Sequence, residues 1–580
     1  MSGILLFGLQ LSCVHNQRIN KQNKNKKNEF ISFEEAKDTT RRNRLINFGN
    51  QFLDDFNKSS NSILGSNSSE FVGITLKIND QLYQLCFKED GDEKKLHAKS
   101  VTQQLDIHNI SQAGYRSLAR IESNLPRENM VSNVKKEITN LMNDEIPIVP
   151  LNLDLRDSDE NNLENDENDE IGSYENLDVE IRDEIMISQG QGGYRSIKRV
   201  LNYAIKILIK KDILDHSLDN KIHIRISGDG RNVGKKIKHV MVTFAILNDI
   251  ENIFQPDNHY CLILYSGIEK YEYLKNALHY LTNELEDIDK NGFIDSDGLK
   301  WKPILYFSSD WKFLSICLGI NNATATNFCP WCLCSKSDHS KLELEWNISK
   351  EIGVIKTNYQ AYAGHKHAPL FSMIPLIHWI PDELHLMLRI TDRLWSLMLE
   401  ETEYKRNERI REQIKNEMSR IRVHFEFWKN QGSNNWCYTS LMGEDKMKVL
   451  KNFDIESILP KNRSDLIREL WNDFDRLYTA LRDSTTDPNF FKIQAKLWLN
   501  KFLIPSIGEP RKGNYIKGLY TNNDVTPYIH VLVHHIHEFM TIHHSFGIKA
   551  FTCSPVEKKN HMQISKYFRK TLRDGGKGKK

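Results

Sequence analysis

The sequence predicts a mixed α/β fold, because apolar segments with the pattern of strands are followed by a long series of segments with helical spacing. The strand-like runs are residues 222–226, 240–247, 260–265 and 301–307. Helical spacing covers residues 269–285 and then most of residues 311–540, with 389–421 and 464–481 as the longest expected helices. We therefore expect an α/β core that is interrupted by a large, mainly helical insertion.

The first 150 residues predict a smaller α+β region. Residues 1–29 are basic and are expected to be disordered. Within 30–150 we expect a helix over 33–56, a strand pair near 71–74 and 81–87, and short amphipathic helices over 111–142 on either side of Pro126. This region is a candidate for DNA binding or dimerisation.

An acidic linker is predicted over residues 151–193. Fourteen acidic residues stand between positions 154 and 184, opposed by only Arg156 and Arg182. Such a composition cannot bury enough apolar surface to order itself. The glycine-rich stretch 190–193 is interpreted as a joint to the next domain.

After this linker the elements have the order of an RNase H-like core. A helix is expected over 196–211, followed by three strands, a helix and a fourth strand, which together form a domain over 194–315. The insertion then occupies 316–540, and a final helix with a basic tail occupies 541–580.

Composition excludes several classes of protein. The 580 residues include 79 Lys+Arg and 77 Asp+Glu, a net charge of +2, which argues against a chain coated with nucleic acid and leaves open a locally basic binding surface. No apolar run approaches the roughly 20 residues of a membrane span. The apolar start lacks the features of a signal peptide, and nine cysteines, several solitary, do not indicate a secreted disulfide framework.

Three acids are candidates for metal-assisted chemistry. Asp229 lies in Ser-Gly-Asp-Gly at the end of the first predicted strand, and Asp310 follows the fourth strand. Glu557 opens the final basic helix. Each has a structural alternative: Asp-Gly is a favoured turn pair, Asp310 can cap a helix, and Glu557 can complement a helix dipole.

A zinc site is predicted from Cys329 and Cys332, which have the C-x2-C spacing of two thiolate ligands. Cys334 and His339 could complete it locally. The other candidate half-site has four histidines in eight residues, His530, His534, His535 and His537. His530 and His534 share a helical face, whereas His530 and His535 require a looser arrangement or a helix end. The alternatives are a pair of buried thiols and a polar helix face.

Asp382 and His385 form a D-x-x-H pattern ahead of an apolar helical run. Asp382 is predicted as an N-cap, with His385 near the same face.

Together and in this order, the strand-associated Asp-Gly, the Asp ahead of C-x2-C, the D-x-x-H, the H-x4-H and the final E-x-x-N resemble the DDE transposase superfamily. The resemblance is to the branch that contains Transib transposases and the V(D)J recombinase catalytic subunit. It covers residues 196–574. The 19 residues from Asp310 to Cys329 and the 247 residues from Asp310 to Glu557 are also similar to that branch.

The resemblance implies an RNase H-like catalytic core, interrupted by a helical zinc-stabilised insertion. Asp229, Asp310 and Glu557 would be the catalytic triad and bind two Mg²⁺ or Mn²⁺ ions, with His385 beside the active site. One structural Zn²⁺ would be bound by Cys329, Cys332, His530 and His535. Basic residues of the final helix would contact DNA: Lys558, Lys559, Lys566, Arg569, Lys570 and Arg573.

The function expected from the resemblance is DNA nicking and strand transfer by a homodimer in the nucleus. DNA would be the partner, with neither a membrane nor a small-molecule substrate. Two alternatives remain: a domesticated protein on the same fold that binds DNA or proteins without catalysis, and an unrelated zinc-stabilised interaction module whose acids are ordinary caps.

Overall fold

The computed structural model describes residues 32–55 with gaps at 34, 38–39, 42, 46, 50 and 53–54, then 73–78, 81–86, 91–153 except 109 and 123, and 190–571 except 218, 234–236, 431, 433–434 and 510–511. It divides into two compact units, Met1–Glu145 and Ile146–Lys580. The basic residues 1–29 and most of the acidic linker lie outside the described residues. None of the described helices combines the length and the apolar character needed to span a bilayer.

The first unit contains a strand pair and helices, as the sequence predicts. Its elements are β1 (Gly73–Ile78) and β2 (Gln81–Cys86), which pair antiparallel, and α2 (Gly91–Ile107), α3 (Gln112–Ile121) and α4 (Glu128–Glu145). The described residues between 40 and 55 are mainly helical. Tyr115 is buried and donates its hydroxyl to the carbonyl of Pro126 at 2.5 Å, which joins α3 to the turn before α4.

The second unit is built on a seven-stranded mixed sheet, which confirms the predicted α/β class. The strands are β3 (Val149–Asn152), β4 (Gln191–Tyr194), β5 (Lys221–Val233), β6 (Ile237–Ile246), β7 (Tyr260–Ser266), β8 (Phe293–Ile294) and β9 (Lys300–Phe307). Their order in the sheet is β3-β4-β7-β6-β5-β9-β8. Among the described strands, β5 and β9 form the one parallel pair.

The predicted glycine-rich joint is a strand instead. Residues 191–194 form β4, which pairs with β3 on one side and β7 on the other. A Cβ on Gly192 would lie 2.5 Å from the carbonyl oxygen of Leu264, so glycine permits the close approach of β4 to β7. The ends of the acidic stretch are therefore neighbours in one sheet.

Strand β5 is longer than the sequence predicts, and this corrects the expected position of Asp229. We expected the strand to end at Ile226, but Asp229 lies inside β5 and pairs with Met241 of β6. The register with β9 does end there, at Ile226 and Phe307. Asp229 thus lies just beyond the point where β9 leaves β5, and β5 continues with β6 alone.

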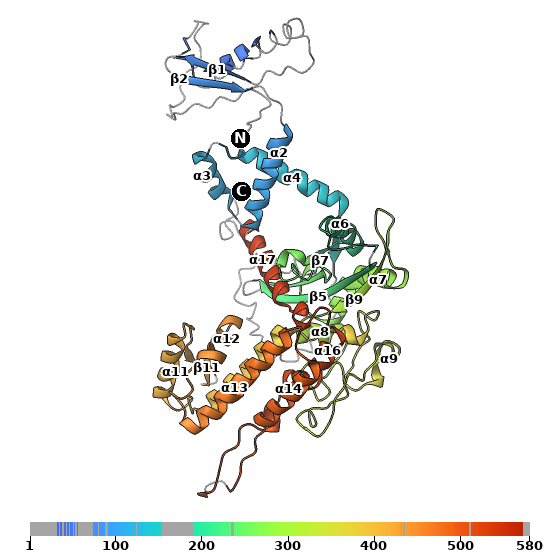
Figure 1. The fold of residues 1–580 in the computed structure, drawn as a ribbon, viewed down its shortest axis with the longest axis vertical. Coiled ribbons are helices and arrows are strands. Elements are labelled where there is room, and N and C mark those ends of the chain that lie inside the picture. Colours follow the sequence, from blue (N-terminus) through green and yellow to red (C-terminus); the bar gives the residue numbers. More distant parts are fainter. Residues whose placement is uncertain are drawn as a thin grey trace. The chain divides into compact units, whose positions relative to one another are not determined.

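The two faces of β5 contact different parts of the chain, because successive side chains of a strand point to opposite sides. On one face, a Cβ at Gly228 would lie 2.1 Å from the ring of Phe313, which belongs to α8 (Trp311–Leu318). On the other face, the buried Arg225 donates hydrogen bonds to the carbonyls of Ala550 at 3.1 Å and Thr552 at 2.8 Å. The segment that leads into α17 (Ser554–Thr571) is therefore bound beneath β5, and α17 runs beside that strand (Figure 1).

Helices dominate the remainder of the second unit. They are α6 (Ile197–Lys210), α7 (Tyr271–Asn291), α9 (Ile352–Thr357), α10 (Glu383–Glu401), α11 (Glu408–Arg420), α12 (Gly443–Asn452), α13 (Lys461–Arg482), α14 (Pro488–Phe502), α15 (Pro527–His534) and α16 (Ile536–Ile542). Between α11 and α12 the chain forms a small antiparallel hairpin of β10 (Phe427–Lys429) and β11 (Trp436–Tyr438). Figure 1 shows α13 and α14 lying side by side.

The single helix expected over 389–421 is two helices. The helix α10 ends at Glu401, and Glu403 has a positive φ of 54°, which a continuing helix does not allow. Asn407 then caps α11 by accepting a hydrogen bond from the amide of Ile410. The apolar spacing lapses at this turn, since Tyr404 is the one apolar residue between Leu399 and Ile410, and this lapse is the sequence signal of the break.

Replacing Gly228 with alanine should destabilise the protein by about 1–3 kcal/mol, because the added methyl group would overlap the Phe313 ring. Urea unfolding measures the effect. The double variant Gly228→Ala, Phe313→Leu should recover part of the loss. Gly353→Ala is a control, since a methyl group added at this exposed helical glycine would meet nothing within 4 Å and alanine favours the helix. Equal effects at both glycines would contradict this packing.

Candidate active site and metal centre

Asp229 and Asp310 lie where β5 and β9 separate. Asp310 is the N-cap of α8, and its Oδ1 accepts a hydrogen bond from the amide of Phe313 at 2.7 Å. The neighbouring Ser309 donates its hydroxyl to the carbonyl of Gly228, which ties the end of β9 to β5. The capping role expected as an alternative is therefore real. This hydrogen bond uses one lone pair of Oδ1, so Oδ2 and the remaining lone pair of Oδ1 can still bind another ligand.

Glu557 reaches the same region from α17. It lies in the first turn of that helix, and Asn560 follows one turn later on the same face. The buried Asn560 donates its side-chain N–H to Oδ2 of Asp229 at 2.7 Å. The amide of Asn560 thus fixes the helix that carries Glu557 against the strand that carries Asp229, although 328 positions separate the two acids in sequence.

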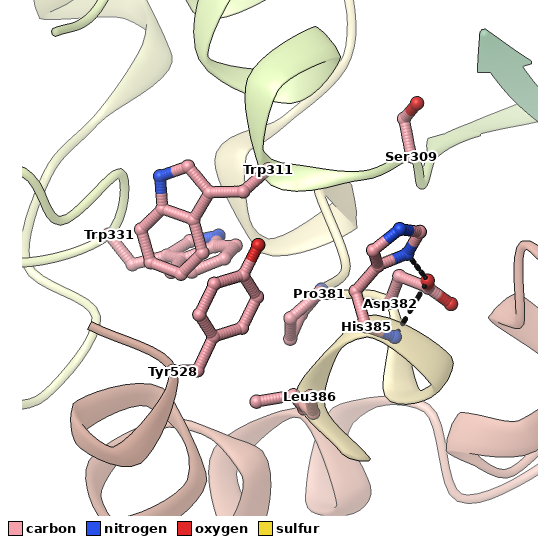
Figure 2. A pocket seen from close by; sticks show the side chains of 8 residues that line it. All are labelled: Ser309, Trp311, Trp331, Pro381, Asp382, His385, Leu386 and Tyr528. Carbon is pink, nitrogen blue, oxygen red and sulfur yellow. Dashed lines mark hydrogen bonds and ion pairs between the residues drawn. The ribbon is translucent and has the colours of Figure 1, made fainter. Parts of the chain in front are cut away.

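Asp382 and His385 connect the helical region to this site. Asp382 caps α10 by accepting amide hydrogen bonds from Leu384 and His385, and it also accepts one from the amide of Cys553 at 2.8 Å. Its Oδ2 lies 2.5 Å from Nδ1 of His385, the contact drawn in Figure 2. The opposite nitrogen of that ring, Nε2, lies 3.7 Å from Oε1 of Glu557.

A small pocket adjoins His385. Trp311, Trp331 and Tyr528 form one side of it, with Ser309 and Asp382 near His385 on the other (Figure 2). Its volume is about 10 Å³, which is the space of about one water molecule. In this conformation it is too small for a nucleotide base.

Burial and mutual repulsion govern the protonation of the acids. Burial raises the pKa of Asp229 to about 6, with a contribution from Asp310, although the hydrogen bond from Asn560 lowers it. Burial also raises the pKa of Glu557, and the nearby His385 opposes that effect. The pKa of His385 is affected by burial, which lowers it, but Asp382, Asp310 and Glu557 outweigh burial and raise it to about 9. His385 is therefore a cation at neutral pH.

The donor chemistry of the acids fits Mg²⁺ or Mn²⁺, because both ions prefer carboxylate oxygens. Asp229 interacts electrostatically with both Asp310 and Glu557, near the point where β9 leaves β5, and an ion bound between these acids would relieve their repulsion. Their ligand atoms are not gathered as tightly as those of the cysteine–histidine cluster. Among the described residues, that cluster is the one group of three or more His, Cys, Asp or Glu side chains gathered closely enough to hold a metal ion. Its ligand atoms all lie within 4.8 Å of one another.

The cluster consists of Cys329, Cys332, His530 and His535, and all four are buried. The distance from Sγ of Cys329 to Nε2 of His535 is 3.4 Å, and so is the distance from Sγ of Cys332 to Nε2 of His530. A tetrahedral zinc ion, with its usual bond lengths, would hold sulfur and nitrogen ligands about 3.5 Å apart. The four side chains therefore fit one zinc ion.

A helix end decides which histidine joins the cluster. The helix α15 ends at His534, and His535 is the residue between α15 and α16. This break turns the His535 ring towards Cys329. Nδ1 of His535 donates a hydrogen bond to Oε2 of Glu538 at 3.0 Å, the carboxylate–histidine arrangement that orients metal ligands. Cys334 and His339 do not belong to the cluster, and His339 instead contacts the carbonyl of Val525.

The basic residues expected to contact DNA are described only in part. Lys558 is exposed, whereas Lys559 lies 3.4 Å from Asp257 and is mostly covered. Lys566, Arg569 and Lys570 belong to α17, but their side chains lie outside the described part of the chain, as does all of Arg573. Arg231 is exposed on β5, and one of its N–H groups donates to the carbonyl of Glu557.

Sequence reasoning missed the roles of two residues. Asn560 is recognisable from the E-x-x-N spacing, because positions three apart share a helical face. Glu269 precedes α7 by two residues and interacts electrostatically with Asp310 and Asp229. No short motif marks Glu269. The glycine at position 230, which leaves room for its carboxylate, is the signal that could have pointed to it.

No protein-family model matches the chain, and a search of curated proteins finds no match either. The functional interpretation therefore rests on the residues and their geometry.

The zinc cluster predicts different outcomes for two adjacent histidines. His535→Gln should abolish binding of the single zinc ion per chain and destabilise the protein, whereas His534→Gln should keep the zinc, since His534 is not a ligand. Elemental analysis of the purified variants measures the zinc content. Cys329→Ser and Cys334→Ser form a second matched pair with the same expected contrast. Zinc loss from both histidine variants would contradict the assignment.

The raised pKa of His385 predicts a pH-dependent contribution to stability. Its charged form stabilises the folded state fully below the unfolded pKa of about 6.5, and that contribution is lost as pH rises through about 9. His385→Gln should therefore cost about 3 kcal/mol more at pH 6 than at pH 10. Urea unfolding of the zinc-loaded protein, without other divalent ions, measures the difference.

His259 provides a control of opposite sign, because burial lowers its pKa to about 3. The stability difference between His259→Gln and the unsubstituted protein should change only as pH falls below about 6.5. A His385→Gln difference that stays constant from pH 6 to pH 10 would contradict the charged pair with Asp382.

Proposed function

We propose that this chain is a metal-dependent DNA transposase or recombinase with Asp229, Asp310 and Glu557 as its catalytic triad. The meeting of these acids near the point where β9 leaves β5 carries the proposal, because they come from three distant parts of the sequence. The hydrogen bond from Asn560 to Asp229 is its strongest single support, since it joins the helix of the third acid to the strand of the first.

An RNase H-like core is part of the same proposal. The order of strand, strand, strand, helix and strand is supplied by β5, β6, β7, α7 and β9. β9 is parallel to β5 and ends at Phe307, opposite Ile226, which is three residues before Asp229. Asp310 follows the end of β9 directly, and this arrangement supports its pairing with Asp229.

The reaction would begin with hydrolysis of a phosphodiester bond. Water would attack phosphorus and the 3′ oxygen would leave as a hydroxyl; that hydroxyl would then attack a second phosphodiester and displace its 3′ oxygen. Two bound Mg²⁺ or Mn²⁺ ions would activate the nucleophile and stabilise the leaving oxygen. The three carboxylates would bind the ions, and the cationic His385 would contact a phosphate oxygen, oriented by Asp382.

Zinc would have a structural role in this scheme. Cys329 and Cys332 lie in the loop after α8, His530 lies within α15, and His535 lies at the α15–α16 break. One ion would join these segments, about 20 residues before α17 begins. The zinc site would then fix the direction in which the chain returns to β5, and so the position of Glu557, without taking part in the reaction.

An oligonucleotide nicking and strand-transfer assay with Mn²⁺ tests the proposal. Asp229→Ala, Asp310→Ala and Glu557→Ala should each lower the rate by about 1,000-fold, because each removes metal-dependent stabilisation of several kcal/mol. Glu272→Ala is the control, since Glu272 lies exposed on the first turn of α7. The affinity for DNA should fall with salt concentration in all the variants.

Three results would overturn the catalytic assignment: no nicking by the unsubstituted protein, equal nicking by the three variants, or the same loss in Glu272→Ala. Salt-dependent DNA binding without nicking would favour a domesticated DNA-binding protein on this fold. Zinc binding with neither activity would favour an interaction module.

A further inference from the structure

An apolar groove with a volume of about 470 Å³ lies between α13 and α14. Six of the residues that line it are apolar: Leu477, Ala480, Phe490, Phe491, Leu497 and Trp498. Beside the groove, Phe490, Ile493 and Leu497 recur at helical spacing along α14, and each of these side chains is more than half exposed. Large apolar side chains that are exposed together beside a groove mark an interaction surface.

The loop between α14 and α15 carries a second exposed apolar surface. It forms an arm, residues 503–519, of which 510 and 511 lie outside the described residues, and it projects from the end of α14 (Figure 1). Ile507 and Ile516 pair across the arm through two backbone hydrogen bonds of 2.9 and 2.8 Å. Both isoleucine side chains are more than 60% exposed. Because an isolated pair of strands is only marginally stable in water, the arm gains stability when another apolar surface covers these isoleucines.

Hydrogen bonds at the base of the arm fix its direction. The amide of Leu519 donates to the carbonyl of Ile504 at 2.9 Å, and Arg463 of α13 donates to the carbonyl of Gly518 at 2.8 Å. The groove lies alongside α14, whereas the arm continues beyond the end of that helix (Figure 1). The arm therefore presents its isoleucines to another molecule rather than to the groove of its own chain.

The arm and the groove carry net charges of opposite sign. Four acids and two bases lie in the groove, next to Lys501 or in the turn that joins the two helices: Glu469, Asp473, Asp483, Asp487, Arg476 and Lys501. The arm has three bases and one acid: Arg511, Lys512, Lys517 and Glu509. The net charge is therefore −2 around the groove, from two bases and four acids, and +2 on the arm, from three bases and one acid. Opposite net charges favour the meeting of the two surfaces.

We propose that two copies of this chain associate by exchanging these arms, so that Ile507 and Ile516 of each copy are bound in the α13–α14 groove of the other. Each copy contributes one arm and one groove, and the contact therefore closes as a twofold dimer. Burial of Phe490 and Leu497 against the exchanged isoleucines drives the association. Two small contacts of this kind lie at the lower end of specific interfaces, so we expect a dissociation constant of about 1–10 μM. The inference does not depend on the proposed function, because neither surface contains a residue of the proposed catalytic site.

Sedimentation velocity of the zinc-loaded full chain without DNA, over about 0.5–100 μM, measures the dimer and its dissociation constant. Ile507→Lys in the arm and Leu497→Asp in the groove should each raise that constant at least about 10-fold, because each places a charge in an apolar contact. Both positions are exposed, so the fold should tolerate the changes, and zinc content and thermal unfolding check this. Met442→Asp is the matched control, since Met442 is an exposed apolar residue at the N-cap of α12, where aspartate is favourable.

A mixture of the two variants separates the exchange of arms from other modes of dimerisation. Leu497→Asp keeps an unaltered arm, and Ile507→Lys keeps an unaltered groove. A mixed pair therefore has one unaltered contact, and in its other contact a lysine on the arm enters a groove that carries an additional aspartate. The mixture should dimerise at least about 10-fold more tightly than either variant alone. A fluorescent label on one of the two variants identifies the mixed dimer in the same sedimentation experiment.

Several results would overturn the inference. A chain that stays monomeric over this range has a groove and an arm for other partners. A dimer that neither Ile507→Lys nor Leu497→Asp weakens, or that Met442→Asp weakens equally, has its interface elsewhere. Weaker dimers of both variants without recovery in the mixture would show that the arm and the groove do not contact each other.

Discussion

The arrangement of the site depends on how the C-terminal segment is bound beneath β5. Arg225 is fully buried and donates to the carbonyls of Ala550 and Thr552, and Ser308 donates to the carbonyl of Phe551. The carboxylate of Asp382 accepts the amide of Cys553. Burying charged groups is costly, and hydrogen bonds such as these offset part of that cost. Four consecutive residues ahead of α17 are therefore fixed in register with the sheet, and the helix begins at a defined place.

Binding of the C-terminal segment beneath β5 brings together two motifs that are far apart in the sequence, the D-x-x-H of Asp382 and His385 and the E-x-x-N of Glu557 and Asn560. The D-x-x-H at the start of α10 caps its own helix, but the same aspartate holds the segment that precedes Glu557. His385 lies between the two, close to Asp382 through one nitrogen and facing Glu557 through the other. The capping interpretation and the functional one are therefore compatible, because a carboxylate can accept several hydrogen bonds at once.

The cysteine–histidine cluster is a second, independent hold on the same part of the chain. It brings the loop after α8 together with α15 and the break between α15 and α16. Glu538 accepts a hydrogen bond from His535 on the side of the ring away from the cluster. Much of the chain between Asp310 and Glu557 can then form helices that pack on one another without displacing the part of β5 that contains Asp229. The net charge of +2 conceals an uneven distribution of charge, since the final helix and its tail, residues 558–580, carry nine basic residues and one acid.

Periodicity and residue spacing predict the α/β class, the order of the principal strands and helices, and the Cys-x2-Cys half of the metal centre, because these are local properties. The other features follow from contacts between distant segments. β5 continues past Ile226 because it stays paired with β6 as far as Val233 after β9 leaves it. The choice of His535 over His534 depends on a helix break, and the turn at Glu403 depends on a left-handed residue. Glu269 has no motif, since its position follows from a space left by Gly230 on a different strand. Contacts between residues far apart in the chain carry no local signature, and these contacts bring the acids together.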